Sequence, residues 1–173
     1  MRPLLSILTV AALLTGSLSA QAEQCARPVE KTAFNVAGLK SQLMVTALSC
    51  QSDAKLGSLD KYNAFISRYR ADLVSQERSL TSYFQRAYGR SAQKQHDDYI
   101  TLLANSQADE GIKSGSFFCQ QNMGMFDEVM ALKTGTDLPV YATTKAIAQP
   151  IALVECPAGG STVKVKSTKT AKK

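Results

Sequence analysis

KYNAFISRYRADLVSQERSLTSYFQRAYGRSAQKQHDDYITLLA, residues 61–104, is the stretch that decides the fold. Apolar residues recur along it at spacings of three and four, which is typical of amphipathic helices. Gly89 interrupts the pattern, as glycine does at a helix C-terminus, and Arg86 and Arg90 are placed to interact with the terminal carbonyl groups. Because Cys50 and Cys119 lie outside the two ends of the stretch, we expect a helical hairpin at the centre of a small domain.

The sequence before Gly89 predicts a first helix and one or two more. Residues 23–34 contain Arg27-Pro28 and are expected to be an extended lead-in, because the residue before a proline avoids the helical region. Asn35 is the expected N-cap of a first helix that reaches Cys50. Asp60 is the expected cap of the next helix. Residues 61–89 form either one bent helix or two helices that meet around residues 70–72, and the slip in periodicity favours a break.

After Gly89 the pattern predicts a long helix, a shorter one and an irregular end. Ser91 opens the long helix, which fades near residues 109–111, and its predicted buried face comprises His96, Tyr99, Ile100, Leu103 and Gln107. Residues 117–132 form the next apolar helix, in which Gly124 either lowers helix stability or marks close packing on a neighbour. Residues 138–156 are interrupted by Pro139 and Pro150 and followed by Pro157. We expect a short helix over residues 139–148 and then an extended arm.

The N-terminus has the composition of an export signal. A positive start is followed by the uncharged apolar run LLSILTVAALL, residues 4–14, and by Ala20-Gln21-Ala22. The run is too short to span a bilayer, and the A-x-A site predicts cleavage after residue 22. No later stretch is apolar enough to cross a membrane. We therefore expect an exported protein, in the periplasm or outside the cell, with a single domain over residues 23–156.

The four cysteines predict two disulfide bonds. An even number of cysteines in an exported chain favours disulfides, and the absence of closely spaced cysteines disfavours a metal site. Four cysteines allow three connectivities. We favour Cys50–Cys119, which would connect the outer helices around the hairpin, and Cys25–Cys156, which would join the two irregular ends. The predicted fold is all-α, a small four- or five-helix bundle stabilised by disulfides.

Charge is unevenly distributed along the chain. Between residues 23 and 156 the 14 basic residues equal the 14 acidic ones, and the basic excess belongs to the tail, residues 157–173. A formally neutral body disfavours nucleic acid as a partner. Residues 61–94 are rich in basic side chains and residues 97–137 in acidic ones. This split is expected on packed helices of a bundle, or else on a surface that binds a partner.

No motif in the sequence identifies a reaction or a cofactor. His96 is the only histidine, and the adjacent Asp97 would point about 100° away from it on a helix, so neither a catalytic relay nor a metal site is expected. Paired carboxylates for hydrolysis would have to come from a general set of acidic residues: Glu77, Asp97, Asp98, Asp127 and Glu128. Neither a dinucleotide-binding glycine motif nor a P-loop is present.

Two groups of residues are candidate binding sites. Tyr88 with Arg86 and Arg90 is an aromatic and basic cluster. The tail is expected to be disordered, and its lysines could bind an anionic envelope polymer or lipid headgroups: Lys164, Lys166, Lys169, Lys172 and Lys173. The leading hypothesis is a non-enzymatic exported binding protein, with another exported protein as an alternative partner. The other hypotheses are a small hydrolase that uses His96 or a carboxylate pair, and a holdase-like chaperone.

Overall fold

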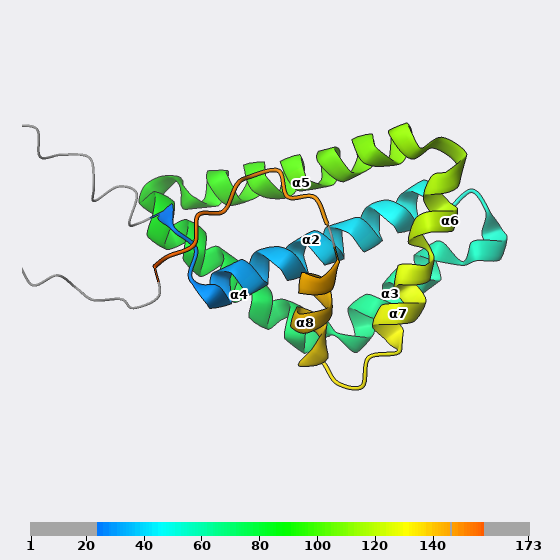
Figure 1. Ribbon diagram of the computed structural model, residues 1–173, viewed down its shortest axis with the longest axis horizontal. Coiled ribbons are helices and arrows are strands. Elements are labelled where there is room, and N and C mark those ends of the chain that lie inside the picture. The colour runs from blue at the N-terminus through cyan, green and yellow to red at the C-terminus, as the bar shows by residue number, and fades with distance from the viewer. Residues whose placement is uncertain (1–23, 146, 158–173) are drawn as a thin grey trace, which may run out of the picture.

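The computed structural model describes residues 24–145 and 147–157 (Figure 1). The predicted signal peptide and the tail lysines Lys164, Lys166, Lys169, Lys172 and Lys173 lie outside these residues. The described chain is predominantly helical, and its only β-structure is an isolated parallel bridge between Ala26 and Glu155. The all-helical prediction is therefore confirmed for this part of the chain. No helix within it is long and apolar enough to cross a membrane.

Helix α2, Pro28–Ser49, lies at the centre and packs against α3, α4, α5 and α8 (Figure 1). The expected extended lead-in and the Asn35 cap were wrong, because α2 begins seven residues before Asn35. Arg27 does take the extended conformation (φ −72°, ψ 158°) that a following proline favours. Pro28 itself occupies the first turn, where a missing N–H group costs nothing. The N–H group of Arg27 donates to the Glu30 carboxylate at 2.7 Å.

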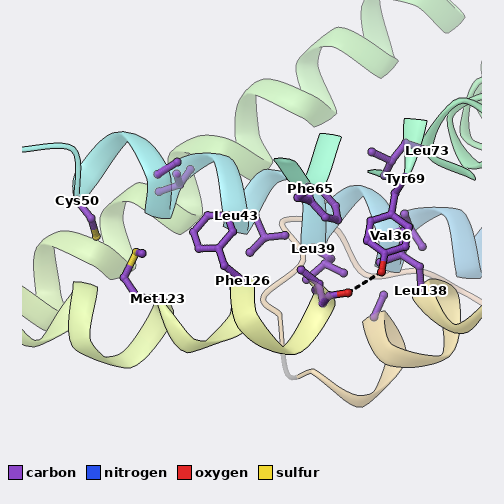
Figure 2. Packing of buried hydrophobic residues seen from close by; sticks show 14 of the residues in the cluster. Val36, Leu39, Leu43, Cys50, Phe65, Tyr69, Leu73, Met123, Phe126 and Leu138 are labelled. Atoms are coloured by element: carbon purple, nitrogen blue, oxygen red, sulfur yellow. Dashed lines mark hydrogen bonds between the residues drawn. The ribbon is translucent and has the colours of Figure 1, made fainter. Parts of the chain in front are cut away.

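The region predicted as one or two helices forms α3, Ser58–Arg68, and α4, Arg70–Tyr88. The favoured break is confirmed, and it falls at Tyr69 (φ −102°, ψ 17°). The Tyr69 ring is buried among core side chains (Figure 2), and its hydroxyl donates to the Val129 carbonyl at 2.6 Å. Asp60 does not cap α3, because Gly57 occupies the N-cap position and Asp60 lies in the first turn.

Gly89 ends α4 with φ +52°, a conformation that glycine adopts readily, and α5 follows as Ala92–Ser114. This confirms the predicted hairpin. Tyr99, Leu103 and Gln107 are buried as expected, whereas Ile100 is 37% exposed and was wrongly assigned to the buried face. Gln107 is satisfied by α2: its side chain accepts from the Ser41 hydroxyl at 2.5 Å and donates to the Gly38 carbonyl at 3.1 Å.

The helix predicted over residues 117–132 is divided into α6, Phe118–Asn122, and α7, Gly124–Met130. Nothing lies within 4 Å of a Cβ placed on Gly124, so the alternative that this glycine marks close packing is wrong. Helix α8, Asp137–Thr144, begins earlier and ends earlier than predicted. Residues 147–157 then form the expected extended arm, which runs back along the bundle to the end where the described chain begins (Figure 1).

Both cysteine pairs are disulfides, with the connectivity favoured from the sequence. Cys50–Cys119 joins the end of α2 to α6 with a Cα–Cα distance of 5.7 Å. Cys25–Cys156 joins the first described residues to the end of the arm with a Cα–Cα distance of 4.8 Å. The apolar core has two clusters. The larger one, around α3, α7 and α8, includes Cys50, and the smaller one, between α4, α5 and the arm, includes Ala26 next to Cys25.

The basic residues of 61–94 and the acidic residues of 97–137 form their ion pairs mainly elsewhere than between α4 and α5. Lys61 of α3 pairs with Asp127 of α7, and Lys94 pairs with Asp98 within α5 at 2.5 Å. Among described residues, the close polar contact between α4 and α5 joins an acid of α4, Glu77, to His96, whose Nε2 atom lies 3.1 Å from the carboxylate. The basic α4 surface therefore does not depend on the acidic residues of α5 to hold the hairpin together.

Candidate binding site

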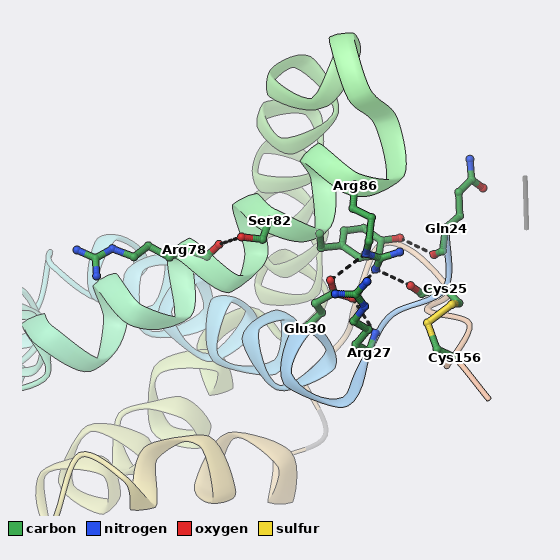
Figure 3. A network of polar contacts seen from close by, with 9 residues as sticks. Gln24, Cys25, Arg27, Glu30, Arg78, Ser82, Arg86 and Cys156 are labelled. Carbon is green, nitrogen blue, oxygen red and sulfur yellow. Dashed lines mark hydrogen bonds and ion pairs between the residues drawn. A yellow bond between two sulfur atoms is a disulfide. The ribbon is translucent and has the colours of Figure 1, made fainter. Parts of the chain in front are cut away.

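Arg86 lies in the last turn of α4, as expected, but the hydrogen bonds described for it go to other parts of the chain. Its guanidinium group reaches α2, where it donates to both oxygens of Glu30 at 3.2 and 2.5 Å (Figure 3). It also donates to the Cys25 carbonyl at 2.8 Å. The Glu30 side chain is 5% exposed and that of Arg86 is 21% exposed. This buried pair therefore connects α4 to the start of α2 and to the Cys25–Cys156 disulfide.

Tyr88 borders a cavity of about 410 Å³ at the same end of the bundle. The wall consists of Tyr83 and Tyr88 from the end of α4, Gln24 from the first described residues, and three residues of the arm: Ile151, Ala152 and Val154. The arm is held at this place by the adjacent disulfide and by two backbone hydrogen bonds. The Ala26 N–H group donates to the Val154 carbonyl at 2.7 Å, and the Cys156 N–H group donates to the Ala26 carbonyl at 2.9 Å.

The two tyrosine rings of the cavity are fixed by aromatic packing. The Tyr88 ring stacks on Phe84, with centroids 5.8 Å apart and planes inclined by 24°. The Tyr83 ring meets Phe34 edge-on at 4.9 Å, and its hydroxyl donates to the Gln24 carbonyl at 3.0 Å. Burial, followed by the neighbouring Tyr88, raises the pKa of Tyr83 to about 12. Tyr83 therefore remains a neutral hydrogen-bonding group at physiological pH.

Arg90 lies outside this cavity and borders a second one of about 250 Å³ together with His96. The His96 ring packs on Phe84 at 5.2 Å, and its Nε2 atom lies 3.1 Å from a Glu77 carboxylate oxygen. Nε2 is buried and no aligned hydrogen bond joins the two groups. The structure therefore separates the three residues of the predicted aromatic and basic cluster: Arg86 is buried in an ion pair, Tyr88 borders one cavity and Arg90 borders another.

The acidic residues considered for catalysis have separate partners. Asp97 accepts from the Gln93 amide, as expected if it does not orient His96. The other contacts join Glu77 to His96, Asp98 to Lys94, Asp127 to Lys61 and Glu128 to Lys145. The pKa of Glu128 is lowered by its hydrogen bonds to Lys145 and Tyr141. Among described residues, no group of three or more histidine, cysteine or acidic side chains is arranged to hold a metal ion.

The sequence did not reveal the Tyr88 cavity or the Glu77–His96 pair. Tyr88 was predicted from the sequence as part of an exposed aromatic and basic cluster, whereas it is half-buried against the smaller core cluster. Other parts of the cavity wall come from residues 151–154, which carry no periodic pattern. Neither a protein-family model, nor a curated protein, nor a solved structure matches this chain. Functional inference therefore depends on the geometry and chemistry of these residues.

Proposed function

We propose that this chain is a non-enzymatic exported binding protein that attaches to an anionic component of the cell envelope through its surface and its basic tail. The two disulfides, and the lack of a membrane-spanning helix among the described residues, are compatible with export. The apolar run and A-x-A site at the N-terminus support a signal peptide. The attachment is electrostatic and depends on lysines that follow the folded body.

The observation that carries this proposal is the position of the Tyr88 cavity beside the exit of the tail. Val154 borders the cavity, Cys156 is covalently attached to Cys25 next to it, and the first lysine of the tail, Lys164, is eight positions after Cys156 in the sequence. A ligand in the cavity would thus lie beside the point where the tail leaves the described body. The body carries no formal net charge, and the lysines attract anions within about 8 Å at physiological salt.

Deletion of residues 159–173 is expected to abolish most of the binding to anionic surfaces. Each lysine near an anionic membrane contributes about 1 kcal/mol, so the loss should be large at low salt and small at high salt. Co-sedimentation of the signal-free chain with phosphatidylglycerol vesicles, at two salt concentrations, measures this difference.

The matched control replaces the exposed body lysines Lys113 and Lys133 with glutamine, and its binding should change little. Equal sedimentation of the full chain and the tail deletion at low salt would contradict the proposed role of the tail.

A hydrolase is the second candidate, because His96 borders a cavity and has a carboxylate within 3.1 Å of its ring. A general base of this kind contributes roughly 100-fold or more to a rate. The binding proposal predicts that His96→Gln and Glu77→Gln leave any ester hydrolysis by the purified protein unchanged. The hydrolase candidate predicts a loss of about 100-fold in both variants. Hydrolysis of p-nitrophenyl esters, with folding checked by circular dichroism, distinguishes the two.

A further inference from the structure

Among the residues that the structure describes, the wall of the Tyr88 cavity has no charged side chain, and this restricts the group that this wall can hold. Its described residues are tyrosine, glutamine or aliphatic, and the guanidinium group of Arg86, at the same end of the bundle, is engaged by Glu30 and the Cys25 carbonyl. An anion moved from water into such a site would lose hydration without gaining a counter-charge. The part of the ligand inside the cavity is therefore neutral.

The wall combines flat apolar surfaces with a few polar atoms. Phe84 covers one face of the Tyr88 ring and so presents the ring as a rigid wall to the cavity, while Ile151 and Val154 supply aliphatic surface. The tyrosine hydroxyls and the Gln24 amide supply hydrogen-bonding groups. The Tyr83 hydroxyl donates to the Gln24 carbonyl, and its oxygen can still accept a hydrogen bond from a ligand. An acyl chain would use only the apolar part of this wall. A ring with C–H groups on its faces and hydroxyls at its edge satisfies both kinds of surface.

The size of the cavity agrees with such a ligand. About 410 Å³ lies in the range of roughly 300–1,000 Å³ found for small-molecule sites. We infer that the Tyr88 cavity binds a neutral sugar unit of an anionic envelope glycan. This inference rests on the proposed function and adds the chemical class of the ligand to it.

The test uses neutral sugars, so that the cavity is examined without the electrostatic contribution of the tail. The isotope-labelled, signal-free chain is titrated with maltotriose, with an N-acetylglucosamine trisaccharide and with decanoate, and NMR shifts are followed. We expect at least one trisaccharide to shift the signals of Tyr83, Tyr88, Ile151 and Val154. Tyr88→Ala should weaken this binding about tenfold or more, a typical effect of truncating a central aromatic contact.

A second variant tests the same cavity in case Tyr88→Ala fails to fold. Ala152 is exposed on the cavity wall, so Ala152→Phe fills the cavity without disturbing the Tyr88–Phe84 stack, and it should also block the sugar. Tyr62→Ala removes a half-buried tyrosine of α3, away from the cavity, and should bind sugar normally. Tyr88→Phe keeps the ring and should retain most of the affinity.

Three results would overturn the inference. They are the absence of shifts with both trisaccharides at millimolar concentration, shifts that persist in Ala152→Phe, and shifts of the same residues by decanoate alone. Each of these leaves the vesicle experiment on the tail unaffected. Loss of vesicle binding on tail deletion, combined with no sugar binding, would therefore retain the proposed function and reject only the ligand assigned to the cavity.

Discussion

Arg86→Ala is expected to lower the free energy of unfolding by about 3 kcal/mol, because it leaves a buried carboxylate without its counter-charge. Glu30 is 3% exposed and would keep only the N–H group of Arg27 as a polar partner among those described. The same substitution removes the hydrogen bond to the Cys25 carbonyl and the guanidinium group placed 5.5 Å from the Tyr83 ring centre. Urea unfolding of the oxidised protein, followed by far-ultraviolet circular dichroism, measures the difference.

Arg78→Ala is the matched control for this substitution. Arg78 is exposed on the same helix, and the hydrogen bond that Figure 3 shows for it uses its backbone carbonyl, which accepts from the Ser82 hydroxyl and is retained in alanine. Its effect should be within about 0.5 kcal/mol. Adding Glu30→Gln to Arg86→Ala should restore part of the lost stability, since the buried charge is then absent. Equal free energies of unfolding for the Arg86 and Arg78 variants would show that the Arg86–Glu30 pair contributes nothing to stability.

The elements that the sequence predicted correctly depend on local patterns. The hairpin between α4 and α5 follows from residues spaced three and four apart and from the glycine at position 89, where φ is +52°. The break between α3 and α4 appeared as a slip in the same periodicity, and the tertiary contact of Tyr69 with Val129 fixes its position. The disulfide connectivity followed from the order of the helices, because it connects residues at corresponding ends of the bundle.

The elements that the sequence did not predict depend on contacts between distant residues. Proline at position 28 was read as an obstacle to helix formation, although it is well suited to a first turn, and the packing of Phe34 in the smaller core cluster extends α2 through this region. Glu30 and Arg86 are 56 residues apart, so no local spacing could reveal their pairing. The Tyr88 cavity likewise depends on distant contacts, because the disulfide, the hydrogen bonds at Ala26 and the packing of Ile151 together place the arm beside the end of α4.

The double substitution Cys25→Ala with Cys156→Ala is expected to cost about 4 kcal/mol in the free energy of unfolding. This bond joins residues 131 apart in the sequence, so its removal greatly increases the conformational freedom of the unfolded chain. In the folded protein, the two backbone hydrogen bonds at Ala26 and the exposed pair between Lys31 and Glu155 would remain near the bond. Further along the arm, Gln149 donates to the Phe34 carbonyl at 3.1 Å and accepts from the Tyr99 hydroxyl at 2.9 Å, so it stays attached to α2 and α5. We therefore expect residues 150–157, beyond Gln149, to open locally before the helices unfold.

Hydrogen exchange followed by mass spectrometry distinguishes this local opening from a general loss of stability. Amides near the Ala26–Glu155 bridge should lose protection in the double variant, while those of the buried part of α2 keep it under native conditions. Lys31→Ala is the control, because it removes the exposed ion pair with Glu155, whose contribution is about 0–1 kcal/mol, and leaves the disulfide intact.

Because three residues of the arm form one wall of the Tyr88 cavity, sugar binding should weaken in the cysteine variant and remain in Lys31→Ala. An arm equally protected in the cysteine variant and in the original protein would mean that the hydrogen bonds of the arm and the packing of Ile151 and Leu153 on the smaller core cluster are sufficient to hold it. The disulfide would then have no part in forming the cavity.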